Sequence, residues 1–175
     1  MTKIALIGSS RAGKNEVALM LAEHYPNLVE VAFADELKYL CSAMFGDVYG
    51  SKNRDALIEI GNSARAIDTD VWVKHLDRRI KFLQAGKAEA DFIITDIRYP
   101  NEVKYARDNG FTILKVSAKD DIRVERALQS GEELDLDNDG DKFVSSLKAD
   151  WTIYNNLGLD ELREAVNYYI NNTNY

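Results

Sequence analysis

KIALIGSSRAGKN, residues 3–15, begins with a short apolar run. A loop follows that starts at Gly8 and ends at Gly13, and Lys14 and Asn15 come directly after it. A stretch with apolar residues at helical spacing begins at Val17. The order predicts a strand, a glycine-bounded loop and a helix. It fits the phosphate-binding pattern G-x-x-x-x-G-K-[ST] at every fixed position except the last, where Asn15 replaces serine or threonine.

The loop has the chemistry that a chain of phosphate groups requires. Two glycines let the backbone wrap around phosphates with successive N–H groups pointing inward, and the helix that follows adds its own N-terminal N–H groups. Lys14 can then reach the β- and γ-phosphates. The alternative is an ordinary turn with a solvated lysine, but the motif requires a preceding strand and a following helix, and both are indicated here. We therefore predict an ATP site formed by Gly8, Ser9, Arg11, Ala12, Gly13, Lys14 and Asn15.

Length and composition limit the class of protein. The 175 residues are 46% hydrophobic and 29% charged, which suits one domain with a substantial core. The net charge of -7 argues against a nucleic-acid polymer as partner, but a small phosphorylated ligand needs only a local positive pocket. Cys41 is the single cysteine, and no apolar run is long enough to span a membrane. We expect a cytoplasmic protein without a membrane partner.

The strand candidates are short, apolar and separated by helical patterns. They lack strict alternation, as expected for strands buried on both faces of a parallel sheet. Strands that alternate with helices predict right-handed βαβ units and a doubly wound sheet. We therefore predict a three-layer α/β fold of the P-loop NTPase type in a single domain, 1–175. The strand candidates are Ile4–Ile7, Leu28–Phe33, Phe92–Thr95, Thr112–Val116 and Trp151–Tyr154.

Two long connections interrupt the alternation. Almost sixty residues without a convincing strand separate the second and third strands, so we predict a helical substrate-binding insert over 38–86. A highly charged segment, 119–147, lies between the last two strands and is the natural place for a lid. It contains Arg123 and Arg126, followed by an acidic run.

Asp96 follows the apolar residues of the third strand, and Arg98 stands two positions further along the chain. Ligands of open α/β sheets bind at the carboxyl ends of the strands, so Asp96 is a candidate for holding Mg²⁺ and Arg98 for facing phosphates. Asp96 could instead cap the helix that begins near Pro100, and the two roles are compatible.

Four further residues are candidates for binding the second substrate, the acceptor of the phosphoryl group. Asp35 and Lys38 follow the second strand, although Asp35 could be only a helix N-cap. Arg54 and Arg65 are eleven positions apart, which places them on one face of a helix where they could hold a monophosphate. Spacing alone favours the plainer reading of a solvated helix face.

The acidic run contains Asp135, Asp137, Asp139 and Gly140, the opening of a calcium-loop pattern. Ser146 stands where the bidentate glutamate of such a loop is required, so we expect no calcium binding. Because carboxylates near ATP would repel its phosphates, we expect the cluster, with Asp141, to lie on the outer side of the lid. Arg123 and Arg126 would then point inward, about one helical turn apart.

Taken together, several segments resemble the bacteriophage deoxynucleoside monophosphate kinases, a branch of the P-loop nucleoside-monophosphate-kinase-like enzymes. The most specific segment is Asp96-Ile97-Arg98-Tyr99-Pro100-Asn101-Glu102. The other matching segments are Gly8 to Asn15, Phe33 to Lys38, Arg54 to Arg65, Ile67 to Val73 and Asp150 to Asn155.

The resemblance implies ATP- and Mg²⁺-dependent phosphorylation of deoxynucleoside 5′-monophosphates to diphosphates, in the host cytoplasm if the chain is phage-encoded. It implies catalytic roles for Lys14, Arg98 and Arg126, and nucleotide binding by the loop and Arg123. The metal would lie at Asn15 and Asp96, and a homodimer is left open. The implied substrate residues are Asp35, Lys38, Arg54, Arg65, Trp72 and Arg98.

The chain departs from that family in the phosphate loop. The family commonly reads Gly-Lys-Asp-Thr where this chain reads Gly13-Lys14-Asn15-Glu16. An amide is a weaker ligand for a hard cation than a carboxylate. Two rival functions follow: a nucleotide-binding regulator without turnover, and a P-loop kinase of another small acceptor.

Overall fold

Apolar runs and amphipathic stretches alternate along the chain, and the computed structural model shows them as five strands and eight helices within residues 1–46, 51–87, 89–136 and 139–173, the part that it describes. Side chains at 51–54, 139, 140, 142 and 145 lie outside that description. The elements are β1 (Lys3–Ile7), α1 (Lys14–His24), β2 (Leu28–Val31), α2 (Asp35–Phe45), α3 (Ser51–Ile67), α4 (Val71–Gly86), β3 (Asp91–Ile97), α5 (Pro100–Asp108), β4 (Thr112–Ser117), α6 (Asp120–Gln129), α7 (Asp139–Ser146), β5 (Trp151–Tyr154) and α8 (Leu159–Asn172).

All five predicted strands are present. The second ends at Val31 rather than Phe33, and the third extends to Ile97, so that Asp96 lies inside the strand. The chain divides into two compact units, which are described separately below. Unit 1 comprises Met1–Glu30 and Glu89–Tyr175, and unit 2 comprises Val31–Ala88.

The sheet has the strand order β2-β3-β1-β4-β5. β1 pairs in parallel with β3 and with β4, and β4 pairs in parallel with β5. Because β1 lies between β3 and β4, the loop that follows β1 emerges beside the carboxyl ends of both neighbours. This is the edge at which open α/β sheets bind ligands.

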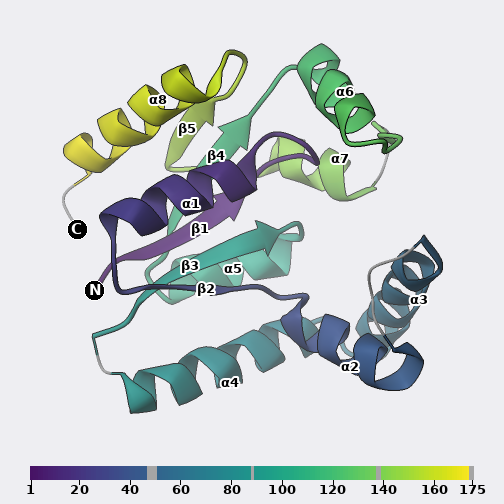
Figure 1. The fold of residues 1–175 in the computed structure, drawn as a ribbon. Coiled ribbons are helices and arrows are strands. Elements are labelled where there is room, and N and C mark those ends of the chain that lie inside the picture. The colour runs from purple at the N-terminus through teal and green to yellow at the C-terminus, as the bar shows by residue number, and fades with distance from the viewer. Residues whose placement is uncertain (47–50, 88, 137–138, 174–175) are drawn as a thin grey trace. The chain divides into compact units, whose positions relative to one another are not determined.

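Helices cover both faces of the sheet in unit 1. α1 and α8 pack together on one face and α5 lies on the other, which gives three layers (Figure 1). The first face has a continuous apolar core, in which Leu6, Leu21, Leu114 and Tyr169 are at most 1% exposed. This core fixes β1 and α1, the two elements between which the loop is held.

Unit 2 contains α2, α3 and α4. Its interior includes Leu37, Cys41, Trp72, Leu76 and Ile80, which are 6% exposed or less. The indole N–H of Trp72 donates to the carbonyl oxygen of Gly61 at 3.4 Å. The predicted insert, 38–86, falls within this unit, and its binding of substrate stays a prediction. Within the described ranges, every helix is too short or too polar to cross a membrane.

Candidate phosphate-binding site

The loop between β1 and α1 depends on its two glycines for different reasons. A Cβ atom at Gly8 would come 2.5 Å from the carbonyl oxygen of Val116, so only glycine allows the loop to pass so close to β4. Gly13 has a φ of 99°, in the left-handed region that other residues rarely adopt. The two positions that the motif reserves for glycine therefore have a steric reason in this fold.

Lys14 is the first residue of α1 and bends back over the loop. Its Nζ donates to the carbonyl oxygens of Gly8, at 2.7 Å, and Ser9, at 3.2 Å. Burial, together with the positive charge of Arg98, lowers the pKa of Lys14 to about 8, against the opposing effects of Asp141 and Asp96. The loop thus holds a poorly solvated ammonium group near other cations, an environment in which a phosphate group would be favoured.

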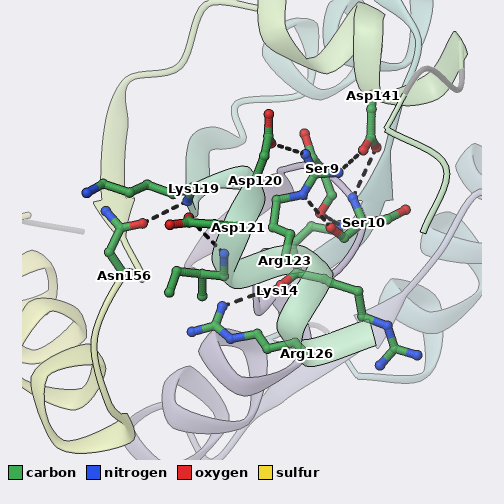
Figure 2. Close-up of polar contacts among 12 residues, drawn as sticks. Ser9, Ser10, Lys14, Lys119, Asp120, Asp121, Arg123, Arg126, Asp141 and Asn156 are labelled. Atoms are coloured by element: carbon green, nitrogen blue, oxygen red, sulfur yellow. Dashed lines mark hydrogen bonds and ion pairs between the residues drawn. The ribbon is translucent and has the colours of Figure 1, made fainter. Parts of the chain in front are cut away.

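Arg123 reaches the loop from α6 and is only 5% exposed. Its Nε donates to the carbonyl oxygen of Ser10 at 2.8 Å. Its Nη1 pairs with Asp120 at 2.7 Å, and its Nη2 pairs with the buried carboxylate of Asp141. Figure 2 shows these side chains meeting at the loop.

Asp141 corrects the expectation that the acidic residues all lie on the outer side of segment 119–147. The residue is 8% exposed, and its carboxylate accepts the backbone N–H of Ser10 at 3.0 Å and also pairs with Arg123. The physical reason is that a buried guanidinium requires a buried anion, and a loop N–H requires an acceptor. Asp135 is exposed, whereas Asp137 and the side chain of Asp139 lie outside the described residues. The absence of calcium binding stays a prediction.

Arg126 also contacts the loop, from the next turn of α6. Its Nη1 donates to the carbonyl oxygen of Arg11 at 3.4 Å. Its Nη2 donates to the backbone oxygen and to the Oδ1 of Asn155, at 3.1 and 3.0 Å. The structure therefore brings both arginines of α6 to the phosphate loop, together with Asn155, which sequence reasoning did not single out as a site residue. The matching segment Asp150 to Asn155 was the only sequence signal that pointed to it.

The loop residue Arg11 faces a different group of side chains. Its backbone has a φ of 62°, and its guanidinium donates to the Oγ of Ser130 at 3.2 Å. It also pairs with Glu132 at 2.5 Å. Arg11 is a predicted nucleotide-binding residue. In this structure its guanidinium instead contacts Ser130 and Glu132, in the connection that follows α6.

Asp96 lies near the end of β3 and Arg98 directly follows that strand, and their charges shift the pKa of Lys14 in opposite directions: Asp96 raises it and Arg98 lowers it. Asp96 is not the N-cap of α5, because Tyr99 stands at that position, and the N–H groups of Arg98 and Tyr99 donate to the Oε2 of Glu102 at 2.8 and 3.1 Å. The alternative of Asp96 as a helix cap is therefore wrong in this structure.

The donor sets fit the groups that the fold leads us to expect. Backbone N–H groups, Lys14 and the two arginines of α6 suit phosphates. Mg²⁺ usually takes one or two protein ligands beside phosphates and water, so Asp96 with the exposed Asn15 is a sufficient set.

The remaining predicted residues belong to unit 2. Asp35 is the first residue of α2 and not its N-cap, and its Oδ2 accepts the N–H of Ala32 at 2.9 Å. Lys38 is exposed on α2, and Arg65 is half-buried on α3. Arg54 also lies on α3, but its side chain is outside the described residues. Trp72 is 3% exposed, so in this structure it is a packing residue of unit 2 rather than an accessible substrate contact.

Comparison with known proteins gives structural likenesses only. No protein-family model and no curated protein matches the chain. A solved structure of TT1252 from Thermus thermophilus is 19% identical with a TM-score of 0.60, and each chain covers 100% of the other. A gluconokinase from Sinorhizobium meliloti 1021 is 13% identical with a TM-score of 0.54 over 98% of both chains. A putative kinase from Chloroflexus aurantiacus is 15% identical with a TM-score of 0.53, over 99% of this chain and 100% of that one. These likenesses, at low identity, show that the chain has the α/β fold of the P-loop kinases.

Proposed function

We propose that the protein is a phosphotransferase that moves the γ-phosphoryl group of ATP to a small acceptor, with Mg²⁺. The observation that carries the proposal is the meeting of three buried or half-buried cations, Lys14, Arg123 and Arg126, at a glycine-bounded loop on the binding edge of a parallel sheet. The gluconokinase and the putative kinase among the structural neighbours support the same class of activity.

The residues of the site would act by positioning and by charge. Transfer of a phosphoryl group needs an in-line arrangement and stabilisation of negative charge rather than a covalent nucleophile. The N–H groups of the loop and Lys14 would hold the β- and γ-phosphates, and Arg98 and Arg126 would stabilise the transferring group. Asp96 and Asn15 would hold Mg²⁺, which would neutralise the developing negative charge when bound. Closure of segment 119–147 would exclude water, which otherwise competes as acceptor.

We further propose that the acceptor is a deoxynucleoside 5′-monophosphate. The support is the resemblance carried by Asp96 to Glu102, together with the arginines of α3. The predicted acceptor residues include the cations Lys38, Arg54 and Arg65, which favours an acceptor that already carries a phosphate.

The test is a panel assay with ATP and Mg²⁺. Ribo- and deoxynucleoside monophosphates, nucleosides and sugars are added singly, and formation of ADP is followed with each. We expect ADP only when a deoxynucleoside monophosphate is present. Turnover with a nucleoside or a sugar alone would mean that this compound, and not a deoxynucleoside monophosphate, is the acceptor. Binding of ADP without turnover on any acceptor would favour the rival function, a nucleotide-binding regulator. In that case Asn15 and Glu16 would have removed the metal geometry that catalysis needs.

A further inference from the structure

We propose that Asn155 is a positioning residue of the phosphate loop: its side-chain amide orients the peptide between Ala12 and Gly13 so that the Gly13 N–H faces the bound phosphates. The inference rests on the proposed function only in taking the loop as a phosphate site. It assigns a role to a residue that follows β5 and is far from the loop in sequence.

The backbone of Asn155 is fixed by sheet pairing, independently of its side chain. Its backbone N–H donates to the carbonyl oxygen of Ser117 at 2.7 Å, which continues the pairing of β5 with β4 by one residue. The residue is 5% exposed. A short side chain on a fixed backbone has few rotamers left, so the amide can act as a fixed point for the loop.

The amide makes two different contacts. Its Nδ2 donates to the carbonyl oxygen of Ala12 at 2.9 Å, and its Oδ1 accepts from Arg126 at 3.0 Å. A Cβ atom at Gly13 would lie 2.2 Å from this Nδ2, so the amide fills the space that any larger residue at position 13 would need. Asn155 therefore packs directly against the left-handed turn that ends the loop.

The hydrogen bond to the Ala12 carbonyl oxygen also determines the direction in which the N–H of Gly13 points. A trans peptide is planar, and its C=O and N–H point in opposite directions. Since the oxygen of Ala12 accepts from Asn155, the N–H of Gly13 points away from Asn155. In a glycine-bounded loop this is a direction in which an N–H can donate to a phosphate.

Two substitutions separate the contact with the loop from the contact with Arg126. Asn155→Asp keeps the shape and an acceptor for Arg126, but it replaces the donor to Ala12 by an oxygen. Asn155→Ala removes both contacts. Asn156→Ala is the matched control, because Asn156 is the next residue and its Oδ1 accepts the N–H of Lys119 at 2.8 Å, away from the loop (Figure 2).

The measurement is calorimetric titration of each purified full-length protein with ADP and, separately, with inorganic tripolyphosphate, which has phosphates but no base. We expect both Asn155 variants to bind both probes about five- to tenfold more weakly than the unmodified protein, the effect of one lost hydrogen bond. The Asn156 variant should stay within about twofold. In kinetics, the KM for ATP should rise while the KM for the acceptor is unchanged.

Three results would overturn the inference. Unchanged affinity of both Asn155 variants excludes a role in the loop. Loss in Asn155→Ala but not in Asn155→Asp means that the residue acts through Arg126. Weaker ADP binding with unchanged tripolyphosphate binding means that it contacts the base.

A measurement on the unmodified protein covers the case in which the variants do not fold. On addition of tripolyphosphate, the amide signal of Gly13 should shift strongly in the nuclear magnetic resonance spectrum, and an unmoved Gly13 signal would contradict the inference. If tripolyphosphate binds as expected but no acceptor is phosphorylated, the proposed function fails and the role of Asn155 stands. If the unmodified protein binds neither probe, both fail.

Discussion

Lys14 combines two properties that usually conflict, a positive charge and a poorly solvated position. Burial lowers its pKa from 10.5 to about 8, so at neutral pH the side chain is still mostly protonated but poorly solvated. For the free protein, the folded state binds fewer protons than the unfolded state between about pH 8 and 10.5. The contribution of Lys14 to the free energy of unfolding is therefore least favourable below pH 8 and improves as the pH rises through that window.

Binding of an anion should show the opposite pH dependence. Phosphates attract the protonated lysine, and the phosphates of ADP are already ionised at neutral pH. We predict that ADP affinity is constant below about pH 8 and falls above it, by at most about tenfold per pH unit, the limit for one proton. Titrations from pH 7 to 9.5 measure this. Lys14→Met should bind more weakly and without the fall, and a flat profile in the unmodified protein would contradict the prediction.

Asp141 and Asp120 both pair with Arg123 but differ in burial. The side chain of Asp141 is 7% exposed and that of Asp120 is 69% exposed. We predict that Asp141→Ala lowers the free energy of unfolding by about 3 kcal/mol, because it leaves a buried guanidinium short of its anion. Asp120→Ala should cost less than about 1 kcal/mol, as for an exposed ion pair. Denaturant unfolding of both variants measures the difference, and equal losses would contradict this account of the pair.

At the scale of the elements, the strands and the loop could be predicted because their signals are local. A run such as Phe92 to Thr95 is apolar at every position but the last, and the two glycines stand at the spacing that the motif requires. The helical spacing of Arg123 and Arg126 likewise indicated one face of α6. Each of these signals lies within a few residues of the chain.

The contacts that complete the site could not be predicted in this way. Asp141 meets Ser10 across 131 positions, and Asn155 meets Ala12 across 143. Such pairs are tertiary contacts and leave no periodic pattern in the sequence. The cap of α5 was missed for another reason: Tyr99 stands at the N-cap position, where the usual pattern has serine or threonine before the glutamate three residues later.

The helices of unit 2 carry the prediction about the acceptor. Arg65 is half-buried on α3, and we predict that Arg65→Ala raises the KM for the monophosphate at least about tenfold, the loss of a charge-assisted hydrogen bond. The KM for ATP should be unchanged. Arg79→Ala is the control, since Arg79 is an exposed arginine of α4 in the same unit. Equal changes in both KM values would remove Arg65 from the acceptor site.

At the scale of the whole molecule, the division into two units predicts which part of the chain a ligand of the phosphate loop stabilises. The phosphate loop belongs to unit 1, as does Trp151, whose ring lies 5.6 Å from that of Tyr169. Trp72, the other of the chain's two tryptophans, is buried in unit 2. Each tryptophan therefore reports on one unit.

We predict that ADP protects the two units unequally. A ligand that binds only the folded loop stabilises it by about 2.7 kcal/mol at a hundred times its dissociation constant. In Trp72→Phe, the fluorescence of Trp151 should therefore show unfolding at a higher denaturant concentration when ADP is present. In Trp151→Phe, the fluorescence of Trp72 should show unfolding at a midpoint that ADP leaves unchanged, because the loop belongs to unit 1 and Trp72 to unit 2. Equal shifts of both signals would mean that the two units unfold as one, and a shift of neither would mean that ADP does not bind the loop.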